Sequence, residues 1–507
     1  MKDTSLSEFS TLRRFIWPIH HFELKKLLPM FFMMFFISFN YTVLRDMKDA
    51  IIVNAPGSGA ETIPAIKLLG VLPAAFIFVA IYGKLANMLS RETLFYATLV
   101  PFLVFFVLFS QVLYPNISWL HPHESAEWLT SVLPLGLHGA VAIYRNWCYA
   151  LFYIFSELWG SVALSLLFWG FANQVTRVTE AKRFYLVFGL GANAALPFAG
   201  RFVRHFSNPL NLEGIVDKWG YTLNRLTLLI VIGGLLVMAL YYYMNNVVLK
   251  DPRFVPQEGE VKKKKKKMKM TIMQSLQHLA QSRYIASLTI LVVSYGMLIN
   301  IYEVTWKSQL KLAYPTMNEY TNFMGFYSET MGYASIIMML FVGGNVIRNY
   351  GWTVAASFTP IVLVVTGSLF FIFVIFKDYL AGPITALGTT PLMLAIYIGF
   401  VQNIMSKSSK YSLFDPTKEI AFIPLDEETK VKGKAAVDVV AARFGKSGGS
   451  MVQNVLLFFG TLATITPYLA VVCLVIGGFW LSAVKVLSKD FHDLSEQRRR
   501  EAEENSN

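Results

Sequence analysis

The sequence predicts an all-α integral membrane protein built from two six-helix halves. Hydrophobic residues make up 55% of its 507 positions and charged residues only 15%, whereas about a quarter of the residues in a soluble domain are charged. The apolar residues are also gathered into long runs. About 20 such residues in a helix cross the roughly 30 Å hydrocarbon layer of a bilayer, so the chain is expected to lie in a lipid bilayer.

Runs of this length recur along the whole chain. The first follows a polar, basic segment and has no small-residue cleavage site after it, so we expect it to remain as the first helix. Cys148 and Cys473 are isolated in apolar runs, which predicts neither a disulfide nor a metal site, and no cofactor is expected. The twelve predicted spans are 27–45, 63–86, 93–114, 146–174, 184–203, 223–249, 284–303, 323–346, 352–376, 383–406, 446–464 and 467–487.

The distribution of Lys and Arg predicts the orientation. Most of the 45 basic residues fall in the segments that would share one side of the membrane, including 1–26, 250–283 and 488–507. The side richer in Lys and Arg is cytoplasmic. We therefore expect both termini in the cytoplasm.

The segment 250–283 divides the predicted helices six and six. It contains an unbroken lysine run, Lys262–Lys267, whose like charges repel one another and favour a solvated linker over a packed element. Such a run attracts anionic lipid headgroups at about 1 kcal/mol per lysine. No motif for nucleic-acid binding accompanies it, so no nucleic-acid partner is expected. The predicted bundles are 27–249 and 284–487.

The two halves resemble each other in sequence. Tyr41 precedes Tyr302 by 261 positions, Gly83 precedes Gly344 by 261, and Pro101 precedes Pro360 by 259. A nearly constant offset indicates a parallel tandem repeat, the arrangement of the two halves of major-facilitator carriers. The segment GKLANMLSR (83–91) is a loose version of the loop between helices 2 and 3 of those carriers. The fold is therefore expected to be major-facilitator-like.

Ionisable residues lie where lipid would otherwise be. Each costs about 2.5–3.5 kcal/mol on insertion scales, so such residues face a cavity or a partner. Basic groups outnumber acidic ones among them, and a positive cavity at low dielectric favours a multivalent anion. The candidate residues are Arg45 and Lys48 at the end of helix 1, Lys67 in helix 2, Glu157 in helix 4, Glu303 and Lys307 in helix 7, and Arg443 and Lys446 opening helix 11.

Structural interpretations compete with this one. Glu303 and Lys307 are four residues apart and can neutralise each other, and the charges in 45–49 can pair at an exposed helix end. Lys67 can extend to the outer interface. Glu157 has no basic residue three or four positions away in its helix, so this position is the hardest to explain structurally.

Four stretches resemble a known family: LRDMKD (44–49), SELWGS (156–161), EVTWKSQLK (303–311) and GKAAVDVVAARFGKSGGS (433–450). They are similar to signature stretches of the nucleotide transporter family, the ATP/ADP translocases of obligate intracellular bacteria and of plastids. The resemblance implies import of host ATP in exchange for ADP, with phosphate accompanying the ADP.

The resemblance also implies the site. The family's four critical charges fall on Lys48, Glu157, Glu303 and Lys446, with the lysines assigned to the phosphate chain. Asn300, Arg145 and Asn146 are second-rank candidates for contacts with the base or the phosphates. The expected partners are ATP, ADP and phosphate, and the expected state is a monomer.

The family has bacterial and plastid members, and the short segment 1–26 before the first predicted helix favours a bacterial inner membrane, with a plastid envelope as the alternative. A proton-coupled symporter for GTP, UTP or ATP remains open, because a glutamate at membrane depth also suits proton coupling. A major-facilitator carrier for another organic anion is a lesser alternative. An enzyme is not expected, since no catalytic set appears at a plausible spacing and Gly445-Lys446-Ser447 lacks the rest of a phosphate-binding loop.

Overall fold

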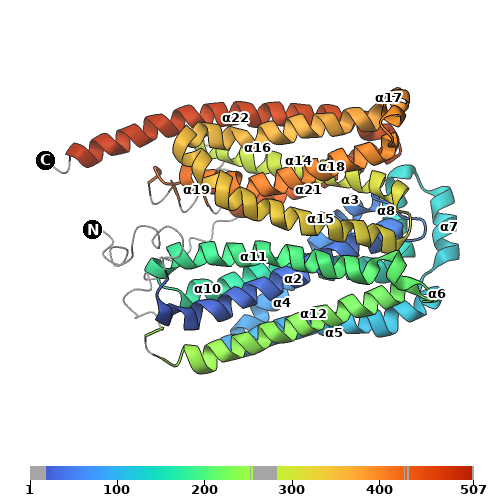
Figure 1. The fold of residues 1–507 in the computed structure, drawn as a ribbon, viewed down its shortest axis with the longest axis horizontal. Helices are drawn as coiled ribbons and strands as arrows, with labels where there is room; N and C mark the ends of the chain where they lie inside the picture. The colour runs from blue at the N-terminus through green and yellow to red at the C-terminus, as the bar shows by residue number, and fades with distance from the viewer. Residues whose placement is uncertain are drawn as a thin grey trace.

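The protein is represented by a computed structural model that describes residues 19–251, 253–254, 282–426, 429–430, 433–434 and 436–504. The predicted lysine run Lys262–Lys267 lies outside these residues. Long helices run roughly parallel to one another, and the first half of the chain, blue to green in Figure 1, lies beside the second half, yellow to red. The start of α2 and the end of α22, the outermost long helices of the described chain, lie on the same face, opposite α7 and α17.

The first half contains six helical rods. Four of them hold π-helical turns, which are frequent at functional sites, at Lys67–Val71, Phe109–Leu113, Gly160–Phe168 and Met244–Val248. The rods are α2 (Leu24–Asn54), α3 with α4 (Thr62–Ile66 and Leu72–Met88), α5 (Arg91–Leu108), α9 with α10 (Trp147–Trp159 and Trp169–Val175), α11 (Val178–Ser207) and α12 (Lys218–Tyr243). The short helices α6 (Ile117–Leu120), α7 (His123–Val132) and α8 (His138–Arg145) join α5 to α9.

The second half follows the same plan. Its helices are α14 (Arg283–Ala313), α15 (Met317–Ile337), α16 (Gly344–Ile375), α17 (Ala381–Ala386), α18 (Pro391–Ser409), α19 (Asp415–Ala421), α21 (Ala442–Leu457) and α22 (Leu462–Glu504). The opening helices of the halves, α2 and α14, are both 31 residues long. Tyr41 and Tyr302 lie on them, while Pro101 and Pro360 lie inside α5 and α16. The paired positions of the sequence repeat thus fall on corresponding helices.

Within the described residues, nine helices are long and apolar enough to cross a membrane. One of them, Met317–Ile375, is 59 residues long and contains Gly351 at φ 81° and ψ 177°, a break that separates two helices. Glycine tolerates this left-handed conformation because it lacks a Cβ atom. The predicted spans near 383–406 and 446–464 correspond to α18 and α21, which are not among the nine, so the count of twelve stays a prediction.

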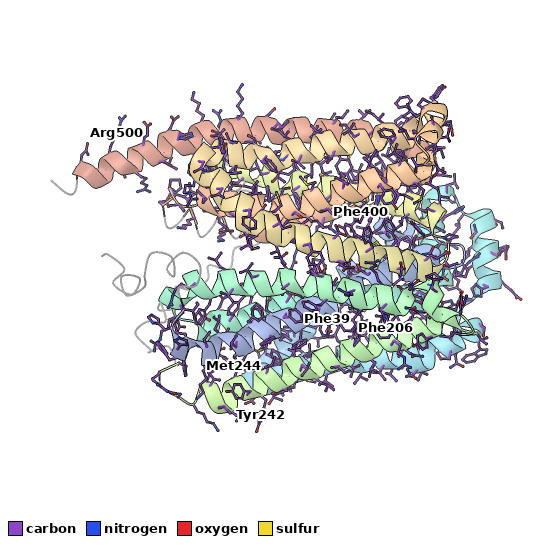
Figure 2. All side chains as sticks on the ribbon, in the orientation of Figure 1. Phe39, Phe206, Tyr242, Met244, Phe400 and Arg500 are labelled. Carbon is purple, nitrogen blue, oxygen red and sulfur yellow. The ribbon has the colours of Figure 1, made fainter. Side chains whose placement is uncertain are left out.

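Large apolar side chains cover the outside of the bundle, where Figure 2 shows sticks projecting along every helix. Phe76, Ile77 and Val79 of α4, Leu235 of α12 and Phe479 of α22 are all more than half exposed. A soluble monomer rarely exposes apolar patches of this extent. Together with the helix lengths, this surface defines a multi-pass membrane protein.

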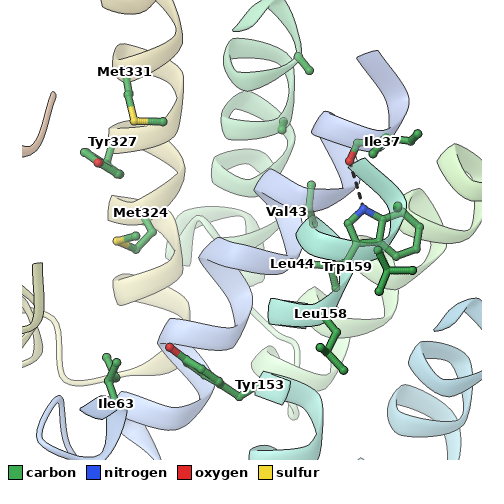
Figure 3. Close-up of a cluster of buried hydrophobic side chains, with 14 of the residues drawn as sticks. Ile37, Val43, Leu44, Ile63, Tyr153, Leu158, Trp159, Met324, Tyr327 and Met331 are labelled. Atoms are coloured by element: carbon green, nitrogen blue, oxygen red, sulfur yellow. Dashed lines mark hydrogen bonds between the residues drawn. The ribbon is translucent and has the colours of Figure 1, made fainter. Parts of the chain in front are cut away.

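The interior is tied together by polar side chains that bond backbone oxygens of other helices. The Trp159 indole of α9 donates to the Ile37 carbonyl of α2 at 3.2 Å, as the dashed line in Figure 3 shows. Asn40 of α2 donates to the Ile230 carbonyl of α12 at 2.8 Å. Because an unpaired amide in an apolar interior is costly, these bonds fix α2 against α9 and α12.

The halves meet over only part of their length. Gly200 of α11 and Gly325 of α15 bring two backbones together so closely that a Cβ on Gly200 would lie 2.4 Å from the Gly325 oxygen. Among the described residues, the hydrogen bonds and ion pairs between the halves lie between the middle of the bundle and the face that carries α7 and α17. We call that face the loop face; the structure is closed there.

Candidate functional site

A buried ion cluster begins on α2. Lys48 Nζ lies 2.9 Å from Asp49 Oδ1 and 2.9 Å from Glu157 Oε1 of α9. The same ammonium stands 4.1 Å from the centre of the Tyr153 ring, within cation–π range. Glu157, which lacks a basic neighbour in its own helix, therefore finds its partner on α2.

The cluster continues into the second half through α14. Lys307 Nζ lies 2.8 Å from Asp49 Oδ2 and 3.2 Å from Glu303 Oε1, one helical turn away. Lys407 of α18 lies 3.3 Å from the same Glu303 oxygen. These contacts form one chain of alternating charge, Glu157–Lys48–Asp49–Lys307–Glu303–Lys407, which we call the ion network.

The ion network is electrically balanced and largely closed to solvent. It holds three lysines and three carboxylates, and Lys48, Asp49 and Lys307 are at most 2% exposed. Removing one partner from a buried pair costs about 3–5 kcal/mol, because the other charge is left uncompensated. The network therefore fixes the relative position of α2, α9, α14 and α18.

A second contact between the halves lies beside the network. Arg45 Nε is 3.2 Å from Asp46 Oδ1, and its guanidinium donates to the Ser328 hydroxyl of α15 at 2.7 Å. That hydroxyl in turn donates to Asp46 Oδ2 at 2.5 Å. The Arg45–Asp46 pair is neutral, so it adds no net charge to the interior.

Two further lysines converge from opposite halves on Asn300 of α14. Lys67 Nζ donates to Asn300 Oδ1 at 3.1 Å. The amide nitrogen of Asn300 donates to the Lys446 carbonyl at 2.7 Å and to the Ser450 hydroxyl at 2.8 Å. We call Lys67, Asn300 and Lys446 the lysine–asparagine bridge.

Glycines allow the close packing that positions Lys446. A Cβ on Gly296 of α14 would lie 2.8 Å from the Gly445 carbonyl carbon and 3.0 Å from the Lys446 nitrogen. Small residues let membrane helices approach in this way. The backbone of Lys446 is thereby pressed against α14, while its side chain is exposed.

The bridge lysines differ from the network lysines in their charge balance. Of the residues that the structure describes, no carboxylate lies within 4.0 Å of the Lys67, Arg443 or Lys446 nitrogens. Lys67 and Lys446 are nevertheless within electrostatic reach of Glu157. Positive charge without a bound carboxylate is thus concentrated next to a neutral network.

The structure decides between the interpretations that the sequence left open. Residues 45–49 are not an exposed helix end, because Asp46, Lys48 and Asp49 are buried. The extension of Lys67 to the outer interface is wrong as well, since Lys67 turns inward to Asn300. Mutual contact of Glu303 with Lys307 is confirmed, although each has a second partner of opposite charge.

Of the three second-rank candidates, Asn300 lies at the bridge, whereas Arg145 and Asn146 lie elsewhere. The Asn146 amide donates to the carbonyls of Pro56, at 2.9 Å, and Ala142, at 3.0 Å. Arg145 lies against Gly57, where an added Cβ would meet its guanidinium at 2.6 Å. Both residues brace the loop after α2, and neither contacts the ion network or the bridge.

Sequence reasoning missed Lys407 and gave Asp49 only a structural role. Lys407 falls next to a predicted span end and so reads as an interfacial residue, but α18 continues through it to Ser409. A signal was available: Lys407 is four residues after Asn403, so the polar face of this helix extends by one more turn. Asp49 sits beside Lys48, and only the neighbouring helices reveal that it contacts two lysines.

Helices of this number and length, an apolar outer surface and a charged interior shared by two repeated halves define a secondary transporter. Buried charges on facing helices of a bundle mark the path of a substrate or ion. Comparison with known proteins gives the family. The TLC ATP/ADP transporter family model matches residues 2–491, and the chain belongs to this family.

Several relatives are similar over nearly the whole chain. It is 54% identical over 494 residues to ADP,ATP carrier protein 1 of Chlamydia pneumoniae, covering 97% of this chain and 96% of that protein. It is 49% identical to the chloroplastic ADP,ATP carrier protein 1 of Arabidopsis thaliana, covering 95% and 76%. For ADP,ATP carrier protein 1 of Rickettsia bellii the identity is 42%, covering 96% and 97%.

Solved structures show the fold. A bacterial homologue of the iron transporter ferroportin, solved in an inward-facing state, matches with a TM-score of 0.52 at 12% identity over 96% of this chain and all of that one. A D-xylose–proton symporter matches with a TM-score of 0.52 at 11% identity over 92% of this chain and 97% of that one. The predicted major-facilitator-like fold is confirmed. Its membership of the TLC ATP/ADP transporter family makes the chain a transporter.

Proposed function

We propose that this protein exchanges ATP for ADP across a membrane by alternating access. The relatives from Chlamydia, Arabidopsis and Rickettsia bear the names of ADP,ATP carriers. The structural observation that carries the proposal is the lysine–asparagine bridge. It places cations without carboxylate partners inside a membrane bundle, where a multivalent anion is the complementary ligand.

The polyphosphate is assigned to Lys67 and Lys446. They come from opposite halves: the Lys67 ammonium and the Lys446 backbone carbonyl both bond Asn300, and both ammonium groups are within electrostatic reach of Glu157. A phosphate chain held by the two ammonium groups would touch both halves at once. Arg443, one turn before Lys446 on the same helix, adds a third cation for the phosphate chain. Lys48 and Lys307 each hold two carboxylates already, so they contact the phosphates only after the ion network rearranges.

Glu157 and Glu303 are assigned to positioning rather than to the phosphates. Both carboxylates bear the same charge as the nucleotide and are retained by lysines in the closed network. Asn300, with its oxygen and nitrogen both engaged at the bridge, holds the two lysine-bearing segments together. Arg145 and Asn146 support the loop face and take no direct part in binding.

The positive-inside pattern supports cytoplasmic termini, and the closed loop face then corresponds to the outside of the cell. The relatives are bacterial and plastid carriers; we place this chain, as a monomer, in a bacterial inner membrane, with the plastid envelope as the alternative. Exchange of ATP⁴⁻ for ADP³⁻ moves one net charge, worth about 2.3 kcal/mol per 100 mV. Export of phosphate with ADP would offset that charge.

Transport into liposomes tests the proposal. Purified protein is reconstituted in liposomes that contain ADP, ADP with phosphate, or no nucleotide, and uptake of labelled ATP is followed with and without a proton gradient. Uptake that requires internal nucleotide and ignores the gradient is expected. Uptake into empty liposomes that depends on external acid would instead indicate a proton symporter, and uptake of another organic anion in preference to ATP would refute the nucleotide assignment.

A further inference from the structure

The ion network passes from one half of the protein to the other at a single ion pair. Glu157, Lys48 and Asp49 belong to the first half, whereas Lys307, Glu303 and Lys407 belong to the second. The connection between the two sets is Asp49 with Lys307 at 2.8 Å. Opening the loop face must separate these residues, because α2 and α14 lie in different halves.

Separation would leave each set with an unbalanced charge. Glu157, Lys48 and Asp49 carry one net negative charge, and Lys307, Glu303 and Lys407 carry one net positive charge. Within a low-dielectric bundle the attraction between such charges is strong. The described residues hold one other ion pair between the halves, Arg204 with Glu329, but the Arg204 side chain is 44% exposed, and exposed pairs contribute little.

We infer that Asp49 is the positioning residue that makes exchange obligatory, with Lys407 as its counterpart in the second half. This inference rests on the proposed ATP/ADP exchange. In the empty carrier the Asp49–Lys307 pair holds the loop face closed. A nucleotide polyphosphate that arrives at the lysine–asparagine bridge competes with Asp49 for Lys307 and thereby releases the connection.

Lys407 keeps Glu303 paired when Lys307 changes partner. When Lys307 moves to the phosphates, Glu303 would lose its nearest counter-charge, at 3.2 Å, but it keeps Lys407 at 3.3 Å. Asp49 likewise keeps Lys48 at 2.9 Å. Every carboxylate of the network thus retains one lysine after the connection opens, provided that a polyanion takes up Lys307. Without that anion the opened carrier has a buried lysine without its Asp49 partner.

The test compares ATP uptake into ADP-loaded and empty liposomes. In the wild type, uptake should depend on internal nucleotide. In Asp49→Asn the carboxylate charge is removed with little change of shape, and the ratio of loaded to empty uptake should fall about tenfold or more, since breaking a buried ion pair is a large perturbation. Asp49→Glu should restore most of the dependence. Lys407→Gln should slow exchange while leaving the dependence on internal nucleotide in place.

Two matched controls distinguish loss of the Asp49–Lys307 ion pair from loss of a charge in general. Arg204→Gln removes the exposed ion pair between the halves. Lys410→Gln removes a lysine three residues after Lys407, in the π-helical turn that follows α18, where it pairs with Asp415 at 2.7 Å. Both should keep the wild-type ratio. An Asp49→Asn protein that exchanges at the wild-type rate and still requires internal nucleotide overturns the inference.

A second measurement detects opening of the loop face directly, so it also applies if the Asp49→Asn protein does not transport. The Ser58 carbonyl of the loop face accepts a hydrogen bond from Lys311 of the other half, so a cysteine at this position reports opening. Without nucleotide, a membrane-impermeant maleimide should label Ser58→Cys several-fold faster when Asp49→Asn is also present. Equal labelling rates overturn the inference. Failure of the wild type itself to exchange ATP for ADP would instead refute the proposed function.

Discussion

Replacement of Lys67 by methionine tests the assignment of the polyphosphate. Methionine keeps most of the apolar stem of the side chain but removes the ammonium, which is bonded to Asn300 at 3.1 Å and has no carboxylate partner among the described residues. A hydrogen bond to a charged group contributes about 1.5–3 kcal/mol. Since each 1.4 kcal/mol is about tenfold in affinity, the KM for ATP should rise about 10- to 150-fold.

The assay is exchange of labelled ATP into ADP-loaded liposomes, combined with binding of ATP, ADP and AMP in detergent. A phosphate contact predicts that Lys67→Met weakens ATP and ADP binding far more than AMP binding. Lys67→Arg keeps the charge and should retain most of the affinity. The matched control is Lys410→Met, whose lysine is already neutralised by Asp415, and it should leave KM close to the wild-type value.

The same variant has a structural cost that can be measured separately. Loss of the Asn300 hydrogen bond, which has a charged donor, should lower the free energy of unfolding by about 1.5–3 kcal/mol, seen as a fall in melting temperature. Lys48→Met should behave differently, since it leaves Asp49 without its own-half partner and Glu157 unpaired, at about 3–5 kcal/mol. An unchanged KM in Lys67→Met, or an equal loss for ATP and AMP, would refute the polyphosphate assignment.

The remaining predictions concern packing. Gly200→Ala should drive the halves apart at the loop face, because the new Cβ would lie 2.4 Å from the Gly325 oxygen and overpacking costs about 1–3 kcal/mol. A loop-face cysteine should then be labelled faster from outside. Gly170→Ala, whose new Cβ would have nothing within 4 Å, should not change the labelling rate. Asn146→Ala should lower the free energy of unfolding by about 1 kcal/mol through loss of its bond to the Pro56 carbonyl. This should be seen as a fall in melting temperature with no change in the KM for ATP. A larger effect on KM than on stability would return Asn146 to the binding site.

The kinds of residues needed for this fold and function can be predicted from sequence. Runs of about 20 apolar residues have few structural solutions other than membrane helices, and the offset between Tyr41 and Tyr302 shows the repeat without coordinates. The cost of burying a charge singles out Lys48, Glu157 and Glu303 in the same way. Local spacing also predicted the contact of Glu303 with Lys307, because residues four apart share a helix face.

What the tertiary structure decided is which charges neutralise which. Asp49 is adjacent to Lys48 in sequence, but its contact with Lys307 joins positions on two helices of different halves. The division between a neutral ion network and the bridge lysines Lys67 and Lys446 likewise depends on distances across the bundle. A sequence pattern reports the face of one helix, whereas electrostatic balance depends on every helix packed around it.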